Sequence, residues 1–191
     1  MLVGLGSGRE ALVLAKKGFT VTGVDFSTDL TEMAKQNCRE RGVRLEVLSQ
    51  EASNLTPRAC AYDIVWLAGG GVYSSIPGRG RRVRLLRKIR AALRDSGSLV
   101  CMFCSSGENK GSRFSRGDLI RRIAAWVTLG NLEWQAGDGL WADSIFYHTF
   151  PSESAVRAEF EEAGFRVVSM RLRQGCGCGA LLRKNSAEGE I

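Results

Sequence analysis

Hydrophobic residues follow two patterns that alternate along this chain. Short apolar runs, typical of buried strands, occupy residues 1–3, 19–24, 44–48, 62–68, 98–103, 165–172 and 179–183. Between them, apolar residues recur every three or four positions, as on one face of a helix, in residues 9–17, 27–41, 81–94, 119–127 and 152–163. Alternating strands and helices predict an α/β fold with a doubly wound, mostly parallel sheet.

The end of the chain departs from this alternation. Its last two apolar runs, 165–172 and 179–183, are separated only by a glycine-rich turn. Two strands joined in this way predict a C-terminal antiparallel hairpin. We expect a single domain over 1–184, with a substrate or lid insertion over 105–150 and a frayed tail over 185–191.

Composition narrows the class of protein. Hydrophobic residues make up 44% of the chain and charged residues 25%, as in ordinary globular domains. No apolar stretch approaches the ~20 residues that span a bilayer, and no secretory signal pattern opens the chain. We therefore predict a cytoplasmic protein that does not interact with membranes.

The chain contains six cysteines and one histidine. Without a secretory signal, a domain of this size predicts reduced cysteines. Two close pairs, Cys101 with Cys104 and Cys176 with Cys178, invite a metal interpretation. However, residues three apart on a strand point to opposite faces, so Cys101 and Cys104 could not converge on one zinc ion. We predict no metal site.

The net charge of +7 is concentrated in the predicted helix 81–94 and the residues just before it. This basic cluster is either a solvated helix face or a patch for nucleic acid or another anion. Nucleic-acid patches usually interleave aromatic side chains with the cations, and only Tyr73 lies close by. The solvated face is the favoured interpretation.

A glycine motif near the start carries the most specific chemistry. Gly4, Gly6 and Gly8 separate the first apolar run from the first helix, and the second run ends at Asp25. This order of strand, glycine turn, helix, strand and acid is the first half of a nucleotide-binding unit. A dinucleotide fingerprint, GxGxxG, would need a third glycine where this chain has Arg9. An NAD-dependent oxidoreductase is therefore the least favoured function.

The GxGxG spacing resembles motif I of the class I S-adenosylmethionine-dependent methyltransferases. Gln50-Glu51-Ala52 resembles the family's acid-then-alanine step after the third strand, and residues 94–99 resemble the turn before its fifth strand. The family also has a C-terminal hairpin. Two departures stand out: Leu2 replaces an acid, and the helix that precedes the first strand in the family is missing. The start is either truncated or covered by another segment.

The resemblance implies S-adenosyl-L-methionine as cofactor and a set of residues that bind it. The three glycines would lie beneath its methionine part, Asp25 would bind the ribose hydroxyls, and Glu51 and Ala52 would meet the adenine. The full cofactor-binding set is Gly4, Gly6, Gly8, Asp25, Phe26, Glu51, Ala52 and Ala68.

Each of these residues also has a purely structural interpretation. The glycines could simply make a tight turn. Asp25 could cap the following helix, because Ser27 comes soon after it. Glu51 could be a solvated loop acid. The common register of all three motifs favours cofactor binding.

Few catalytic side chains are expected, because a sulfonium methyl is already activated and mainly needs an aligned acceptor. His148 is a candidate base, since histidine titrates near neutral pH, although no orienting acid is evident near it in the sequence. Tyr147 is a second candidate. Substrate selection is expected in residues 69–76 and 105–150, which follow the fourth and fifth strands.

The sequence thus predicts methyl transfer from S-adenosylmethionine to an unidentified small-molecule acceptor. The first alternative is a non-catalytic, methyltransferase-like binding or scaffold protein. The second is an RNA methyltransferase, suggested by the arginines.

Overall fold

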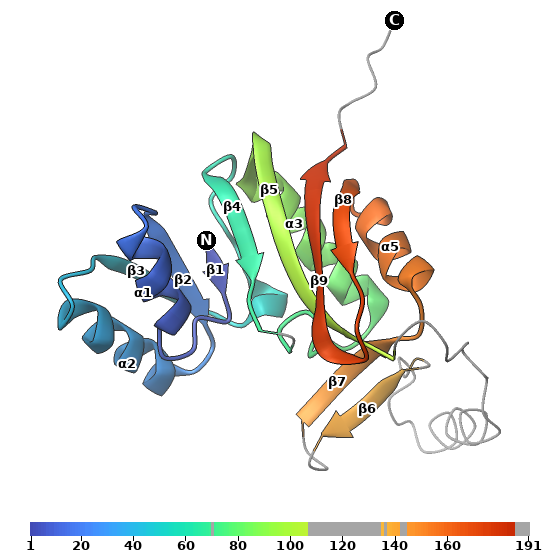
Figure 1. Cartoon of the computed structure of the whole chain (residues 1–191), viewed down its shortest axis with the longest axis horizontal. Coiled ribbons are helices and arrows are strands. Elements are labelled where there is room, and N and C mark those ends of the chain that lie inside the picture. Colours follow the sequence, from blue (N-terminus) through green and yellow to red (C-terminus); the bar gives the residue numbers. More distant parts are fainter. Residues whose placement is uncertain (70, 107–134, 136, 142–144, 186–191) are drawn as a thin grey trace, which may run out of the picture.

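Figure 1 shows the computed structural model of the chain, which describes residues 1–69, 71–106, 135, 137–141 and 145–185. In that part of the chain, the strands are β1 (Leu2–Val3), β2 (Val21–Asp25), β3 (Leu45–Ser49), β4 (Tyr62–Leu67), β5 (Leu93–Ser105), β6 (Asp138–Trp141), β7 (Ile145–Phe150), β8 (Phe165–Arg171) and β9 (Gly175–Lys184). The helices are α1 (Arg9–Lys16), α2 (Thr28–Arg39), α3 (Arg79–Ala92), α5 (Glu153–Glu162) and the 3-10 helix η1 (Ala52–Asn54). None of these helices is long and apolar enough to cross a membrane.

The strands form one mixed sheet in the order β3-β2-β1-β4-β5-β7-β6, with β9 and β8 attached beside β5. Strands β1 to β5 run parallel to one another, while β9 is antiparallel to both β5 and β8. This arrangement confirms the predicted α/β fold and its C-terminal antiparallel hairpin. Strand β9 begins at Gly175, earlier than predicted, because it has a partner strand on each side.

Helices cover the two faces of the sheet in different places. Val65 and Leu67 of β4 belong to the larger core, together with residues of α3 and α5. The intervening Trp66 packs on the opposite face, in the smaller core that includes residues of α1 and α2. Figure 1 shows α3 and α5 behind β5, β9 and β8. Because β1, β2, β4 and β5 run parallel to one another, their carboxyl ends lie at the same edge of the sheet.

The predicted insertion 105–150 ends in strands that the sequence analysis did not anticipate. Strand β7 pairs in parallel with the last residues of β5, through Cys104 with Thr149 and Ser105 with Phe150. Strand β6 pairs with β7 as an antiparallel hairpin. The predicted helix 119–127 lies outside the described residues.

A disulfide between Cys104 and Cys176 shows that the prediction of fully reduced cysteines was wrong. The two residues are 72 positions apart in sequence, but β5 and β9 are neighbouring strands that bring them together. The disulfide joins one cysteine from each of the two close pairs, so neither pair indicates it by its own spacing. No group of three or more metal-binding side chains occurs among the described residues.

The basic helix is also less solvated than predicted. The side chain of Arg82 is fully buried and pairs with Glu159 of α5, with Nη2 2.7 Å from Oε1. Arg79 and Arg87 both pair with Glu162, one turn further along α5. These pairs form because α3 packs against α5. Three arginines of the basic helix therefore make ion pairs between the two helices.

Candidate cofactor and acceptor site

The glycine loop after β1 has a backbone that favours glycine. Gly4, Gly6 and Gly8 all have positive φ angles, of 85°, 53° and 85°. A Cβ at Gly4 would lie 2.5 Å from Cγ2 of Val72, so a larger residue would collide with the loop after β4. A Cβ at Gly6 would meet no atom within 4 Å. The loop therefore leaves open space directly beside Gly6, as a ligand that approaches the backbone requires.

Asp25 is held at the end of β2 by two backbone groups. Its Oδ2 accepts a hydrogen bond from the Gly6 N–H at 2.8 Å, and its Oδ1 accepts one from the Ser27 N–H at 3.1 Å. The helix cap is Ser27, whose Oγ accepts from the Leu30 N–H. Ser27, and not Asp25, is therefore the N-cap residue of α2. A carboxylate has about four acceptor positions, so Asp25 keeps two for a ligand.

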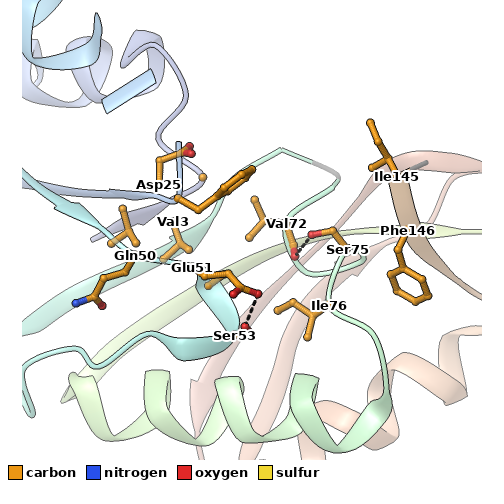
Figure 2. Close-up of a pocket in the computed structure, with 14 residues that line it drawn as sticks. Val3, Asp25, Gln50, Glu51, Ser53, Val72, Ser75, Ile76, Ile145 and Phe146 are labelled. Carbon is orange, nitrogen blue, oxygen red and sulfur yellow. Dashed lines mark hydrogen bonds between the residues drawn. The ribbon is translucent and has the colours of Figure 1, made fainter. Parts of the chain in front are cut away.

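Asp25 lines a cavity of about 490 Å³ at the carboxyl ends of the parallel strands. Figure 2 shows Asp25, Gln50 and Glu51 at one end of this cavity and Ile145 and Phe146 at the other. Its complete lining is Val3, Gly4, Val24, Asp25, Phe26, Gln50, Glu51, Ala52, Ser53, Val72, Ser75, Ile76, Ile145 and Phe146.

The end that contains Asp25 gathers most of the predicted cofactor residues. Phe26 is 76% exposed although it has a large apolar side chain. The carboxylate of Glu51 accepts hydrogen bonds from Ser53 Oγ at 2.6 Å and Asn54 Nδ2 at 3.3 Å, which fix it at the start of η1. Of the predicted set, Gly4, Asp25, Phe26, Glu51 and Ala52 line the cavity, whereas Gly6, Gly8 and Ala68 do not.

The other end of the cavity is apolar. Val72, Ile76, Ile145 and Phe146 contribute hydrocarbon side chains, and Ser75 contributes a hydroxyl that donates to the Val72 carbonyl. The sequence analysis assigned substrate selection to the two segments that supply these residues but named none of them. In the sequence, these residues are recognisable only as apolar positions outside the predicted helices and strands. That pattern does not distinguish a residue that lines a cavity from one that packs in the core.

The two catalytic candidates, His148 and Tyr147, lie on β7 and do not line the cavity. Tyr147 is half-buried and packs over Gly139 of β6. His148 is only 4% exposed, and its ring meets Phe150 edge-on, with 4.6 Å between ring centroids. An orienting acid does accompany this histidine: Nδ1 lies 2.6 Å from Oδ1 of Asp138.

A buried polar network fixes the loop that lines the apolar end. The hydroxyl of Tyr73 donates to Glu159 at 2.6 Å, and Arg82 binds the same carboxylate. Nη2 of Arg82 also donates to the side-chain oxygen of Gln135, whose backbone N–H donates to Asp138. Burial, and secondarily the negative charge of Glu159, raises the pKa of Tyr73 well above its usual value. The Tyr73 hydroxyl therefore stays protonated and keeps its hydrogen bond at physiological pH.

Known proteins resemble this chain in sequence and in fold. A sequence profile described as "Methyltransferase domain" matches residues 1–97. Ubiquinone biosynthesis O-methyltransferase from Coxiella burnetii is 36% identical over 63 residues, which are 33% of this chain and 27% of the relative. This chain therefore matches only about a quarter of the length of that curated relative.

Two solved structures illustrate the likeness in fold. A SAM-dependent methyltransferase from Methanosarcina mazei aligns with a TM-score of 0.72 and 18% identity, covering 96% of this chain and 91% of that one. The Burkholderia thailandensis 1,6-didemethyltoxoflavin-N1-methyltransferase, solved with its substrate and S-adenosylhomocysteine, aligns with a TM-score of 0.66 and 16% identity, covering 97% and 71%. Because the profile spans just over half of the chain, and the strand order and glycine loop agree with it, this chain belongs to the methyltransferase domain family, with the fold of the class I enzymes.

Proposed function

We propose that this protein transfers the methyl group of S-adenosyl-L-methionine to a small, largely apolar acceptor. The observation that carries the proposal is the cavity, which joins a polar end at the glycine loop to an apolar end at β7. One compartment with two chemically different ends suits a polar cofactor and an apolar acceptor that must meet in line.

The residues at the polar end fit the proposed cofactor. Asp25 has two free acceptor positions for the ribose diol, and charge-assisted bonds of this kind are the stronger ones. The open space beside Gly6 suits the methionine part, since a side chain there would fill it. Glu51 and Ala52 would meet the adenine, and the exposed ring of Phe26 would pack on its face. Gly8 and Ala68 would shape the loop without touching the ligand.

The bound cofactor would supply an activated methyl group. The protein's own task is then to align the acceptor and exclude water. Val72, Ile76 and Phe146 are suited to both tasks, because apolar walls bind an apolar acceptor and keep the reacting atoms dry. Among the described residues, no charged side chain lines this end of the cavity. Two proteins that this chain resembles, the ubiquinone biosynthesis O-methyltransferase and the 1,6-didemethyltoxoflavin-N1-methyltransferase, are named for small-molecule methylation, which supports a small molecule as acceptor.

RNA methylation is the weaker candidate. The arginines that suggested it include Arg82, which is buried, and Arg79 and Arg87, which pair with Glu162. Cations engaged within the fold offer fewer contacts to phosphates. Cytoplasmic location stays a prediction.

Calorimetric titration with S-adenosylhomocysteine and with NAD tests the cofactor. We expect S-adenosylhomocysteine to bind and NAD to bind at least tenfold more weakly; the reverse order would refute the proposal. Incubation with S-adenosylmethionine and a panel of phenols, quinols and aromatic heterocycles then tests turnover, measured as S-adenosylhomocysteine released. Cofactor binding without release from any acceptor, including RNA, would favour the non-catalytic alternative.

A further inference from the structure

We infer that Asp138 is a positioning residue that fixes the tautomer of His148, leaving Nε2 to accept a proton from the acceptor. The inference rests on the proposed function and sharpens it. It assigns the acceptor to compounds that lose a proton on methylation, namely those with a hydroxyl or an N–H group.

The geometry around Asp138 holds its carboxylate rigidly. Asp138 of β6 and His148 of β7 are directly opposite each other in the hairpin. Oδ1 lies 2.6 Å from Nδ1 of His148, and Oδ2 accepts the backbone N–H of Gln135 at 2.7 Å. The two side chains are only 1% and 5% exposed. With both oxygens engaged away from water, the carboxylate has one stable orientation.

This orientation decides which ring nitrogen carries the proton. A neutral imidazole has one N–H donor and one acceptor nitrogen. An ionised carboxylate only accepts, so Nδ1 must be the donor in the contact with Asp138. Nε2 is then the basic nitrogen, and it takes no part in the contact with Asp138. A base oriented by a third group in this way is a recurring catalytic arrangement.

The position of His148 in the sheet links it to the acceptor end. Side chains two apart on a strand point to the same face, so His148 shares a face of β7 with Phe146, which lines the cavity. In the described part of the chain, this hydrogen-bond network continues from Asp138 through Gln135 to Arg82, which pairs with Glu159. His148 itself is not part of the cavity lining, so we expect an acceptor that packs against Phe146 to approach Nε2 along this face of the strand, directly or through one water.

The proton-transfer step balances without a further reactant. The oxygen or nitrogen of the acceptor forms a bond to the methyl carbon, and the bond from that carbon to sulfur breaks with its electron pair going to sulfur. The acceptor's proton goes to Nε2 of His148 and then to solvent.

A spectroscopic test is available because the chain has a single histidine. In ¹⁵N-histidine-labelled protein, we expect the neutral ring to show a protonated Nδ1 and an unprotonated Nε2. In Asp138→Asn, the amide oxygen is expected to accept from Gln135, so the amide NH₂ faces Nδ1 and shifts the proton to Nε2. The exposed acid Asp95 provides the control variant Asp95→Asn, which should keep the original tautomer.

The functional test compares the same variants. With a methylated hydroxyl or N–H acceptor from the panel, Asp138→Asn should lower kcat about 100-fold, as loss of general-base catalysis does, and leave the Kd for S-adenosylhomocysteine within twofold. Asp138→Glu, which keeps a carboxylate, should recover part of the rate. Circular dichroism and melting temperature establish that each variant is folded.

Several outcomes would overturn the inference while the proposed function stands. These are an inverted tautomer with unchanged kcat, a wild-type Nε2 that is already protonated in the neutral ring, or methyl transfer confined to thioethers and tertiary amines. If no panel member is methylated, phenol added to S-adenosylhomocysteine-saturated protein must still shift the Nε2 resonance. An unmoved resonance also overturns it. Failure to bind S-adenosylhomocysteine at all would instead refute the proposed function.

Discussion

The backbone N–H of Gly6 donates to Oδ2 of Asp25 at 2.8 Å, across 19 residues of sequence. This bond ties the glycine loop after β1 to the end of β2, the two places where the sequence motif is most specific. It fixes the carboxylate at the cavity before any ligand arrives. A preorganised acceptor lowers the entropic cost of binding.

Replacing Asp25 with alanine should weaken S-adenosylhomocysteine binding roughly 10- to 100-fold, because hydrogen bonds to a charged group contribute about 1.5–3 kcal/mol. Calorimetry measures the change. Asp29→Ala is the matched control, since Asp29 is an exposed acid in the first turn of α2, outside the cavity. Unchanged affinity in a folded Asp25→Ala protein would remove this residue from the site.

Phe26 should contribute to binding and little to folding. The residue is 76% exposed, so Phe26→Ala should change the free energy of unfolding by less than about 0.5 kcal/mol. Stacking of a base on an aromatic ring contributes about 1–3 kcal/mol, and we expect a 5- to 150-fold loss of S-adenosylhomocysteine affinity. Phe19 is 49% exposed and lies outside the cavity, so Phe19→Ala should bind normally. Equal affinity in both variants would exclude stacking at Phe26.

The polar end of the cavity was predictable because its parts are local in sequence. The glycine loop, Asp25 and Glu51 each lie at or within two residues of the end of a strand, and the carboxyl ends of parallel strands meet at one edge of a sheet. The alternation of strands and helices therefore brings them together without any knowledge of side-chain packing. Only the competing role of Asp25 as a helix cap needed the structure, which gives that role to Ser27.

The apolar end was not predictable at the level of residues. Ile145 and Phe146 reach the cavity because β7 pairs with the last residues of β5, 45 positions earlier in the chain. The contact between Asp138 and His148 depends on the register of the β6–β7 hairpin, and the disulfide depends on the neighbouring positions of β5 and β9. Such pairings are decided by the whole sheet and leave no local pattern.

The buried pair of Arg82 and Glu159 should matter far more for stability than the surface pair of Arg79 and Glu162. Removing one partner of a buried ion pair leaves an uncompensated charge and costs about 3–5 kcal/mol, whereas exposed pairs contribute about 0–1 kcal/mol. We expect Arg82→Met to lose several kcal/mol in denaturant unfolding and Arg79→Met less than about 1 kcal/mol. If Arg82→Met loses as little stability as Arg79→Met, the buried pair does not contribute to the stability of the fold.

Thiol counting tests the disulfide. The chain has six cysteines, of which Cys104 and Cys176 are paired. Unfolded protein should therefore react with four equivalents of a thiol reagent before reduction and with six after it. Six reactive thiols before reduction would contradict the disulfide.

The same reagent should distinguish the free cysteines in the native protein. Cys60 is exposed and should react first, while Cys38, Cys101 and Cys178 are buried. Burial, followed by the charge of Glu159, raises the pKa of Cys101 well above its usual value. Because the thiolate is the reactive form, Cys101 should stay unlabelled at pH 8 until the protein unfolds. Rapid native labelling of Cys101 would show that the core around it opens readily.

The open space beside Gly6 leads to a prediction with a close internal control. Gly6 and Gly42 both have positive φ, 53° and 67°, and a Cβ would meet no atom within 4 Å at either position. Replacing either glycine with alanine should therefore lower the free energy of unfolding by a similar amount, about 1–2 kcal/mol for a left-handed conformation. Only Gly6 adjoins the proposed cofactor site, so Gly6→Ala should lower S-adenosylhomocysteine affinity at least tenfold, and Gly42→Ala should leave it unchanged. If the two variants lose the same melting temperature and bind S-adenosylhomocysteine equally well, Gly6 is needed only for the conformation of the turn and not for the ligand.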